Sequence, residues 1–177
     1  MKRTWLFLSG LLAVLLLAAA CGSPKIYTDY DETKDFKTYQ SFNFYEGIKS
    51  GLDTLDQKRL QRALVKNLEE KGFSRSKHPD FLINYYADFT KETNHNSLGI
   101  SIGAIGSPVG GNIASGIPIT NNRKIMNVTI ELIDAQENTL YWQGVAEVRL
   151  KHNRTPEDRT RLFTTIAEKT LREYPPK

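Results

Sequence analysis

The chain has 177 residues, with 24 lysines and arginines, 20 aspartates and glutamates, 40% hydrophobic residues and a single cysteine. This composition is ordinary for a globular domain and excludes collagen, a long coiled coil and a wholly disordered acidic chain. One cysteine cannot form an internal disulfide bond, and three scattered histidines are a poor supply of zinc ligands.

The first twenty residues have the order of a secretory signal peptide: a positive region, an apolar region and small residues at the cleavage site. Lys2 and Arg3 are followed by an uncharged stretch at 5–20 that ends in three alanines. This stretch is short for a bilayer core of about 30 Å, which needs roughly 20 helical residues. The sequence therefore predicts a cleaved signal peptide at residues 1–20 in preference to a permanent transmembrane helix.

Cys21 directly follows these small residues, where a bacterial lipoprotein signal places the cysteine that receives diacylglycerol. The motif resembles a lipobox, with cleavage between Ala20 and Cys21. An ordinary secretory signal beside a cysteine is the alternative, but it would leave an unpaired thiol in an oxidising compartment. We therefore expect acyl chains on Cys21, and two or three such chains hold a protein on a bilayer almost permanently.

Cleavage would remove Lys2 and Arg3 and leave a mature chain, residues 21–177, with a formal net charge of +2. That charge is too small for electrostatics alone to select a membrane or a nucleic acid, so no nucleic-acid partner is expected. Gly22 occupies the position where some sorting systems read aspartate as an inner-membrane retention signal. Because glycine stands in place of that aspartate, we expect an outer-membrane anchor with the protein on the periplasmic face.

The mature chain, residues 21–177, is of a size at which one hydrophobic core is sufficient. We expect residues 21–25 to form a short lipidated tether and residues 26–177 to form one domain. At the start of that domain, segments rich in tyrosine and phenylalanine at 26–31 and 41–45 predict a first pair of β-strands.

Two segments have the periodicity of amphipathic helices. In the first, Asp53 or Thr54 can cap the helix, and leucines recur at three- and four-residue spacing until Gly72. In the second, Thr155 can cap the helix, because a proline and then an aspartate follow it as in a capping box. We expect this second helix to end before Pro175.

Three further segments alternate apolar and polar residues, which is the pattern of half-buried strands. The first is 80–93, and the other two, 126–132 and 140–148, flank a short polar loop and predict a β-hairpin. On the last of these strands, the alternation places Trp142 in the core and turns Tyr141 outward.

The predicted order is β-β-α-β-β-β-α, and the strands have polar alternate faces. This combination predicts an α+β fold, with a mainly antiparallel five-stranded sheet that carries both helices on one face, after a cleaved signal peptide. A doubly wound parallel sheet is disfavoured, because it would need more crossover helices and strands that are apolar on both faces.

An uncharged insertion at residues 93–122 contains six glycines and six isoleucines. One explanation is a flexible loop or a hairpin that extends the sheet. The other is a surface for a partner or a lipid face, because a long loop without a role is uncommon and exposed apolar patches mark contacts. The candidate contact residues are Ile100, Ile102, Ile105, Val109, Ile113 and Ile117.

The sequence provides little for catalysis or for cofactor binding. Aspartates alternate from Asp29 to Asp35 as in an EF-hand loop, but Lys34 and Gln40 stand where that loop needs glycine and glutamate. The histidines lack the spacing of a metal pair, no Gly-x-Ser-x-Gly elbow occurs, and the glycine runs fit no nucleotide-binding motif. We therefore expect no metal, no cofactor and no enzyme activity.

Several motifs resemble, in order, those of a known protein family. They are Tyr27-Thr28-Asp29-Tyr30-Asp31, Asp35-Phe36-Lys37-Thr38-Tyr39, Pro79-Asp80-Phe81-Leu82-Ile83, Leu132-Ile133-Asp134-Ala135 with Tyr141-Trp142-Gln143-Gly144, and Tyr174-Pro175-Pro176. The family is that of bacterial envelope lipoproteins with the domain of unknown function 4136. Departures are Glu32, where proline is expected, and Phe44, where tryptophan is expected. The resemblance implies a compact α+β lipoprotein and brings no catalytic residues.

Three hypotheses of function follow. We favour a non-enzymatic outer-membrane lipoprotein, held by Cys21, that acts through protein contacts in outer-membrane assembly or maintenance. The alternatives are a binder of a small envelope ligand, such as a lipid or peptidoglycan fragment, in a cleft between sheet and helices, and an unrecognised hydrolase. The expected partners are thus the membrane and an envelope protein, and the oligomeric state is left open.

Overall fold

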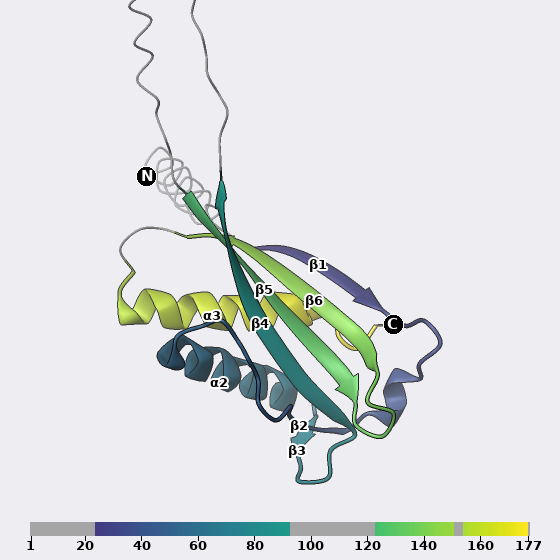
Figure 1. Cartoon of the computed structure of the whole chain (residues 1–177). Coiled ribbons are helices and arrows are strands. Elements are labelled where there is room, and N and C mark those ends of the chain that lie inside the picture. The colour runs from purple at the N-terminus through teal and green to yellow at the C-terminus, as the bar shows by residue number, and fades with distance from the viewer. Residues whose placement is uncertain (1–23, 93–122, 151–153, 177) are drawn as a thin grey trace, which may run out of the picture.

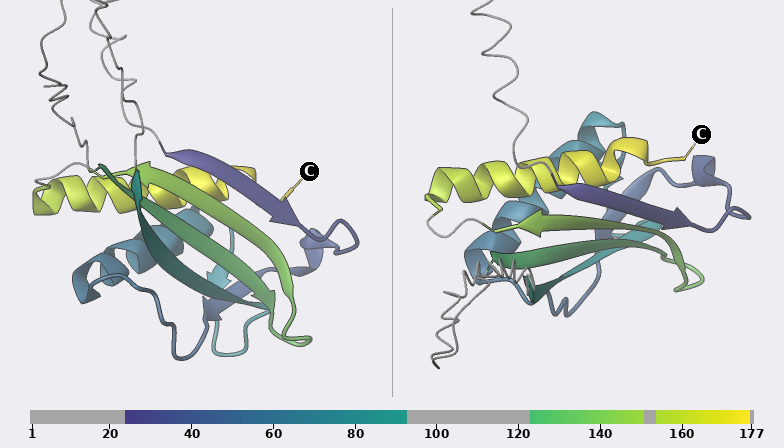
Figure 2. Two further views of the ribbon diagram at one scale, coloured as in Figure 1. Left: turned by 45° about the horizontal axis from the view of Figure 1, so that its top comes forward. Right: turned by 90° about the horizontal axis from the view of Figure 1, so that it is seen from above.

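The computed structural model describes residues 24–92, 123–150 and 154–176. They form one β-sheet with two helices on one of its faces (Figure 1 and Figure 2). The strands are β1 (Lys25–Tyr30), β2 (Ser41–Phe44), β3 (Ser74–Arg75), β4 (Phe81–Glu92), β5 (Arg123–Asp134) and β6 (Leu140–Arg149). The helices are α2 (Thr54–Glu70) and α3 (Pro156–Thr170), with short 3-10 helices η2 (Phe36–Thr38) and η3 (Leu171–Glu173).

The sheet has six strands in the order β1-β6-β5-β4-β2-β3. The pairings from β1 to β4 are antiparallel, whereas β2 runs parallel to β4 and β3 runs parallel to β2. The predicted α+β fold with two helices on one face is confirmed. The prediction of five mainly antiparallel strands is wrong, because the sheet is mixed and has a sixth strand, β3.

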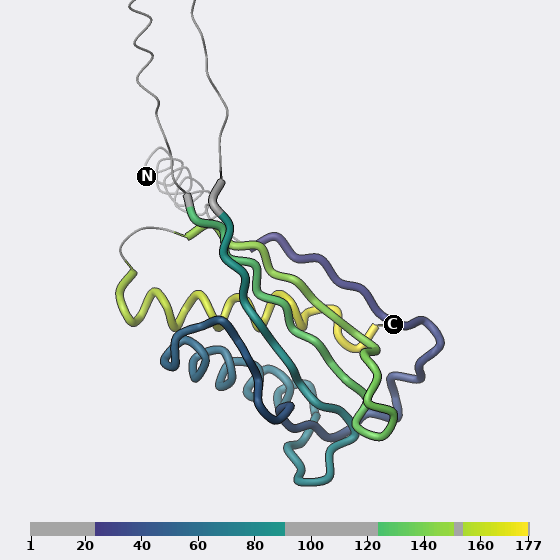
Figure 3. The backbone as a smooth tube through the Cα atoms, viewed as in Figure 1, coloured from purple at the N-terminus to yellow at the C-terminus, as the bar shows by residue number. Residues whose placement is uncertain are grey.

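The first two strands do not pair with each other as predicted. β1 pairs with β6 at one edge of the sheet, and β2 pairs with β4 near the other edge (Figure 3). α2 then connects β2 to β3 and β4 as a crossover helix, and such a connection allows strands to run parallel. The alternation of residues along a strand predicts its two faces but not its neighbours.

The core lies between the sheet and the two helices. α2 contributes Leu60, Leu64 and Leu68, which are fully buried as their spacing predicts, and α3 contributes Phe163 and Ile166. Fully burying one such side chain stabilises the fold by about 1.5–3 kcal/mol. The strands contribute alternate residues, namely Phe42, Phe81, Ile83, Tyr85, Ala87, Met126, Val128, Ile130, Leu132, Trp142, Ala146 and Val148.

Both helices begin at the predicted capping residues. The Asp53 carboxylate accepts a hydrogen bond from the backbone amide of Asp56 at 2.9 Å. Thr155 and Asp158 form the predicted capping box at the start of α3. Gly72 has a φ of +94° just after α2, in the left-handed region that favours glycine, so the predicted end of this helix is also confirmed.

A β-bulge changes the side-chain alternation of β6. Leu132 pairs with Trp142, but the next residue of β5, Ile133, pairs with Leu140, so Tyr141 is an extra residue on β6. Tyr141 is 1% exposed and Leu140 is 48% exposed. The prediction that Tyr141 points outward is therefore wrong, because the bulge turns it into the core, whereas the predicted burial of Trp142 is confirmed.

Tyr141 belongs to a buried cluster of aromatic rings. Its hydroxyl lies 2.8 Å from that of Tyr174, and its ring stacks on Tyr39 with a centroid distance of 4.3 Å. The Tyr39 hydroxyl donates to the Asp134 carboxylate at 2.8 Å. Burial raises the pKa of all three tyrosines, so they remain neutral hydrogen-bonding groups. The cluster packs the C-terminal residues against the sheet.

A substitution at Gly144 of β6 tests this packing. A Cβ atom at this position would lie 2.7 Å from Cη2 of Trp142 and would overlap the methyl group of Thr170. We expect Gly144→Ala to lower the free energy of unfolding by about 1–3 kcal/mol, because the neighbouring side chains must shift in a filled core. Urea unfolding of the mature chain measures this change.

Thr170→Ser provides the matched control, because it removes the methyl group that the added Cβ would meet. The double variant is expected to lose less free energy of unfolding than the two single variants lose in sum, since the two sites share one contact. Strictly additive losses, or a Gly144→Ala variant as stable as the unaltered chain, would contradict the packing described here.

Candidate functional site

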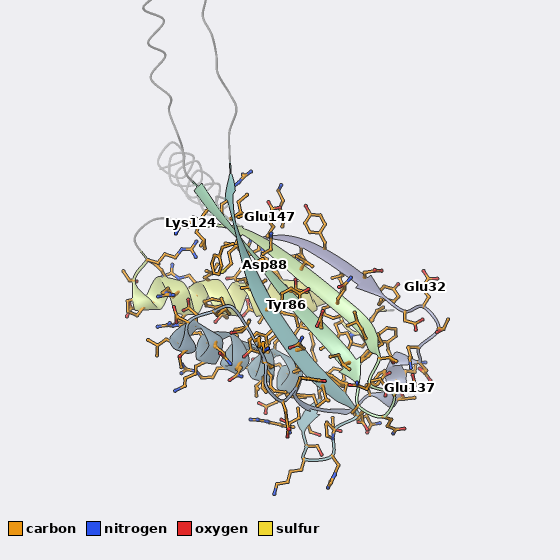
Figure 4. The ribbon with its side chains drawn as sticks, in the orientation of Figure 1. Glu32, Tyr86, Asp88, Lys124, Glu137 and Glu147 are labelled. Atoms are coloured by element: carbon orange, nitrogen blue, oxygen red, sulfur yellow. The ribbon has the colours of Figure 1, made fainter. Side chains whose placement is uncertain are left out.

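Four strand ends meet at one end of the sheet. Lys25 at the start of β1 pairs with Glu147 near the end of β6, and Glu147 is labelled in Figure 4. Ile125 near the start of β5 pairs with Arg149 of β6 and with Thr90 of β4. We call this region, defined by these five residues, the β1-start end. β4 ends and β5 begins at this end of the sheet.

A pocket of about 270 Å³ lies at the β1-start end, on the side of the sheet that carries the helices. Its apolar lining consists of Leu52, Phe89, Met126, Leu150, Leu162 and Phe163, and its charged lining consists of Asp53, Asp56, Arg154 and Arg159. Phe89 continues the inward-facing residues of β4, but it is 51% exposed while Ala87 is 7% exposed. This last part of β4 is therefore less covered than the rest of the strand, and we call the hollow beside it the end pocket.

Two aspartates and two arginines neutralise one another at the end pocket. Asp56, which is 6% exposed, accepts a hydrogen bond from Nη1 of Arg59 at 2.7 Å and another from Arg159. Arg159 also pairs with Asp53. The backbone amide of Asp56, followed by Arg159, lowers the pKa of Asp53, and the bond to Asp56 raises the pKa of Arg159. The network joins the first turns of α2 and α3.

Arg154 is the fourth charged residue of the end pocket, and its charge is not paired in this way. Its Nη2 donates a hydrogen bond to the carbonyl oxygen of Arg149 at 3.2 Å. Within the described ranges, no carboxylate oxygen lies within 4.0 Å of its guanidinium. Burial lowers the pKa of Arg154, because loss of water destabilises the charged form. A guanidinium has five N–H donors, so Arg154 retains donors for an anion.

A second hollow, of about 600 Å³, lies between α2 and the last two strands of the sheet, β2 and β3. Phe44 and Val65 line it, and the Arg75 guanidinium lies 5.6 Å from the centroid of the Phe44 ring. The rest of the lining comes from α2 and β3 and consists of four cations, one acid and one amide, namely Lys58, Arg62, Lys66, Arg75, Glu69 and Gln61. This α2 groove is basic, which suits contact with an acidic surface.

The face of the sheet away from the helices is largely polar. One row across four strands consists of Tyr86, Thr129, Val145 and Tyr27, in that order. Asp88 and Glu147 lie in the next row toward the β1-start end (Figure 4). At the β1 edge of this face, Tyr27 is 57% exposed. The open face is therefore a largely polar surface with an exposed tyrosine at its β1 edge.

The residues that the sequence predicts as functional lie outside the described ranges. Ala20 and Cys21 precede residue 24, so cleavage and lipid attachment stay predictions. The six candidate contact residues of the insertion 93–122 are also outside the described part: Ile100, Ile102, Ile105, Val109, Ile113 and Ile117. The described residues on either side of that insertion, Glu92 of β4 and Arg123 of β5, pair with each other at the β1-start end.

The charged residues of the end pocket were not predicted as a site from the sequence. Asp53 was expected to cap a helix, and Arg154 and Arg159 belong to no motif. The available signal was a pair of arginines around the first turn of one helix and acidic residues around the first turn of the other. Their meeting depends on how α2 packs against α3, which residue spacing does not reveal.

The alternating acidic residues after β1 take part in turns. Asp31 accepts hydrogen bonds from the amide and the hydroxyl of Thr33, at 2.9 and 2.6 Å, and Asp35 caps η2. Among the described residues, no group of three or more histidine, cysteine, aspartate or glutamate side chains is placed to hold a metal ion. None of the described helices has both the length and the apolar character needed to cross a bilayer.

Residues 26–176 match a protein family described as a domain of unknown function, DUF4136. The chain belongs to the DUF4136 family. The family resemblance of the sequence motifs is therefore confirmed, and the match includes all of the described residues except the first two, 24 and 25. No curated protein matches the sequence.

Solved structures are similar to this DUF4136 protein at low sequence identity. A PDZ domain protein from Parabacteroides distasonis ATCC 8503 has a TM-score of 0.54 and 19% identity. The alignment covers 96% of the DUF4136 chain but 40% of that protein, so this chain spans less than half of its length. The PelC dodecamer from Paraburkholderia phytofirmans has a TM-score of 0.48 and 11% identity, over 84% of this chain and 95% of PelC. The first similarity shows the fold alone.

Asp53 of the DUF4136 domain provides a test of the charge network. Asparagine caps a helix about as well as aspartate, so Asp53→Asn removes the charge and keeps the cap. Folding lowers the pKa of Asp53 from 3.8, so its charge stabilises the fold above pH 3.8 and ceases to do so as the pH falls through the lower folded value. We expect a loss of up to about 1 kcal/mol at neutral pH, because the carboxylate is half exposed.

Urea unfolding across a pH series measures this difference. Asp88→Asn on the open face is the matched control and should stay within about 0.5 kcal/mol of the unaltered chain at neutral pH. A difference between Asp53→Asn and the unaltered chain that persists undiminished in strong acid would show that the charge of Asp53 is not its cause.

Proposed function

We propose that this protein is a lipid-anchored envelope protein without catalytic activity, held in the outer membrane by acyl chains on Cys21 and facing the periplasm. It acts there through protein contacts in outer-membrane assembly or maintenance. The signal-like residues 1–20 and the position of Cys21 beside Ala20 support this proposal.

The observation that carries the proposal is the short distance along the chain between Cys21 and the folded domain. β1 begins at Lys25, four residues after the cysteine. Four residues span at most about 14 Å, even when fully extended. An acylated Cys21 would thus hold the β1-start end of the domain close to the bilayer surface, and the opposite end would point away from it.

β1 is the candidate surface for a protein partner. It is an edge strand whose one neighbour is β6, so its other backbone edge has no strand partner within the described sheet. Tyr27 and Tyr30 are 57% and 42% exposed along it. An edge strand with exposed aromatic side chains can accept an extended peptide by strand addition, in which backbone hydrogen bonds provide affinity.

A second candidate function is the binding of a small envelope ligand, and the end pocket is the observation that favours it. The pocket lies between sheet and helices, and it combines apolar walls with the partly desolvated guanidinium of Arg154. The hydrolase alternative has no comparable observation in its favour among the described residues.

Palmitate labelling in bacterial cells tests the anchor. The unaltered chain is expected to incorporate label and to fractionate with membranes, because acylation of Cys21 supplies the binding energy. Cys21→Ala is expected to lose the label, since the acceptor sulfur is absent. Ser23→Ala, which keeps the cysteine, is the matched control and should label normally. Equal labelling of Cys21→Ala and the unaltered chain would refute the lipoprotein assignment.

A further inference from the structure

We propose that the end pocket binds the phosphate-bearing headgroup of an anionic phospholipid of the bilayer in which Cys21 is anchored. The inference rests on the proposed lipid anchor and deepens it, because it assigns a ligand to the end of the domain that the anchor would bring to the membrane.

The position of the end pocket favours this ligand. Phe89, Met126 and Val148 form a row across β4, β5 and β6, one position beyond the pairing of Lys25 with Glu147. Neighbouring strands are about 4.8 Å apart, so Phe89 of β4 lies about 14 Å across the sheet from β1. The tether from Cys21 spans a similar distance. The pocket is therefore within reach of the headgroup layer, which is roughly 5–7 Å thick on each side of the bilayer.

The polar part of the pocket favours an anion. Asp53 and Asp56 are paired with Arg59 and Arg159, so their charges are compensated inside the protein. Arg154 differs from the other charged lining residues. Its guanidinium donates to a carbonyl oxygen and has, within the described ranges, no carboxylate within 4.0 Å. A partly desolvated guanidinium gains more from an anion than a fully hydrated one does, because the local dielectric constant is lower.

The geometry of a guanidinium suits phosphate in particular. Its planar N–H donors can bind two phosphate oxygens at once, which makes the contact directional as well as electrostatic. A bond from Arg154 Nη2 to the Arg149 carbonyl oxygen leaves other donors of the group for this purpose. A zwitterionic headgroup has the same phosphate but also a cationic group. The two carboxylates that line this pocket are already paired with arginines, so they do not favour that cation.

The apolar part of the pocket favours a lipid over a free phosphate ion. Leu52, Phe89 and Leu162 line the same hollow as Arg154, and Phe89 is half exposed. Covering apolar surface contributes about 25 cal/mol per Å², and the glycerol and first methylenes of a lipid can provide such cover. The volume of about 270 Å³ is below the usual range for whole small ligands, so the acyl chains would remain in the bilayer.

Native mass spectrometry of the mature protein, purified in detergent as cells produce it, tests the proposal. The probes are dihexanoyl phosphatidylglycerol, dihexanoyl phosphatidylcholine and inorganic phosphate. We expect one phosphatidylglycerol to bind about tenfold more tightly than phosphatidylcholine, and inorganic phosphate to bind more weakly than either. Equal binding of the two lipids would overturn the preference for an anion. Inorganic phosphate that binds as tightly as phosphatidylglycerol would overturn the lipid assignment.

Variants of the lining residues identify the site. Arg154→Ala is expected to lower the affinity for phosphatidylglycerol about tenfold, which corresponds to about 1.4 kcal/mol. The affinity of Arg154→Lys for phosphatidylglycerol should lie between those of the unaltered chain and Arg154→Ala, because lysine keeps the charge but loses the bidentate geometry. Phe89→Ser should lower the affinities for phosphatidylglycerol and phosphatidylcholine by the same factor. Arg161→Ala, an exposed arginine of α3 outside the pocket lining, is the matched control and should bind normally, and circular dichroism confirms that each variant is folded.

The same spectra separate this proposal from the proposed anchor, because the intact mass of the protein reports acylation of Cys21. An acylated protein in which Arg154→Ala binds both lipids as the unaltered chain does would overturn the headgroup site and leave the anchor in place. A protein that is not acylated but prefers phosphatidylglycerol through Arg154 would overturn the anchor and the stated source of the lipid, while the anion-binding site would stand.

Discussion

The sheet buries one of its two faces, and the rest of the molecule depends on this constraint. α2 and α3 lie side by side on that face and supply the leucines and aromatic residues that complete the core (Figure 2). The other face can then remain polar and hydrated. At the β1-start end the last part of β4 is less covered than its neighbours β5 and β6, since Phe89 is half exposed while Met126 and Val148 in the same row are buried, and the end pocket forms there.

The parts of the fold that the sequence predicted correctly depend on neighbours within about one helical turn. Caps such as Asp53 and Thr155, and the leucine spacing of α2, are local features of this kind. The position of β2 beside β4 depends on a crossover through α2, and the inward position of Tyr141 depends on a bulge against β5. The first is decided by pairing between segments far apart in the chain, and the second by the register within the β5–β6 hairpin. The spacing of apolar and polar residues along one strand predicts neither.

The same distinction applies to the candidate site. The cysteine motif could be read from adjacent residues, whereas the end pocket combines residues from α2, β4, β5 and α3. Within that pocket, the pairing of Asp56 with both Arg59 and Arg159 is what leaves Arg154 as the guanidinium without a carboxylate partner among the described residues. A guanidinium that has no carboxylate partner among the described residues can be recognised only after the other charges have been paired in space.

The antiparallel ladder between β1 and β6 has a mechanical consequence. Six residue pairs join the strands, from Lys25 with Glu147 to Tyr30 with Trp142. If the membrane holds the chain just before β1 and a bound partner pulls from the opposite end of the domain, the force runs along the strand. The ladder is then loaded in shear, so its hydrogen bonds resist together instead of opening one after another. A short lipid tether joined to an edge strand would thus make an attachment that resists force.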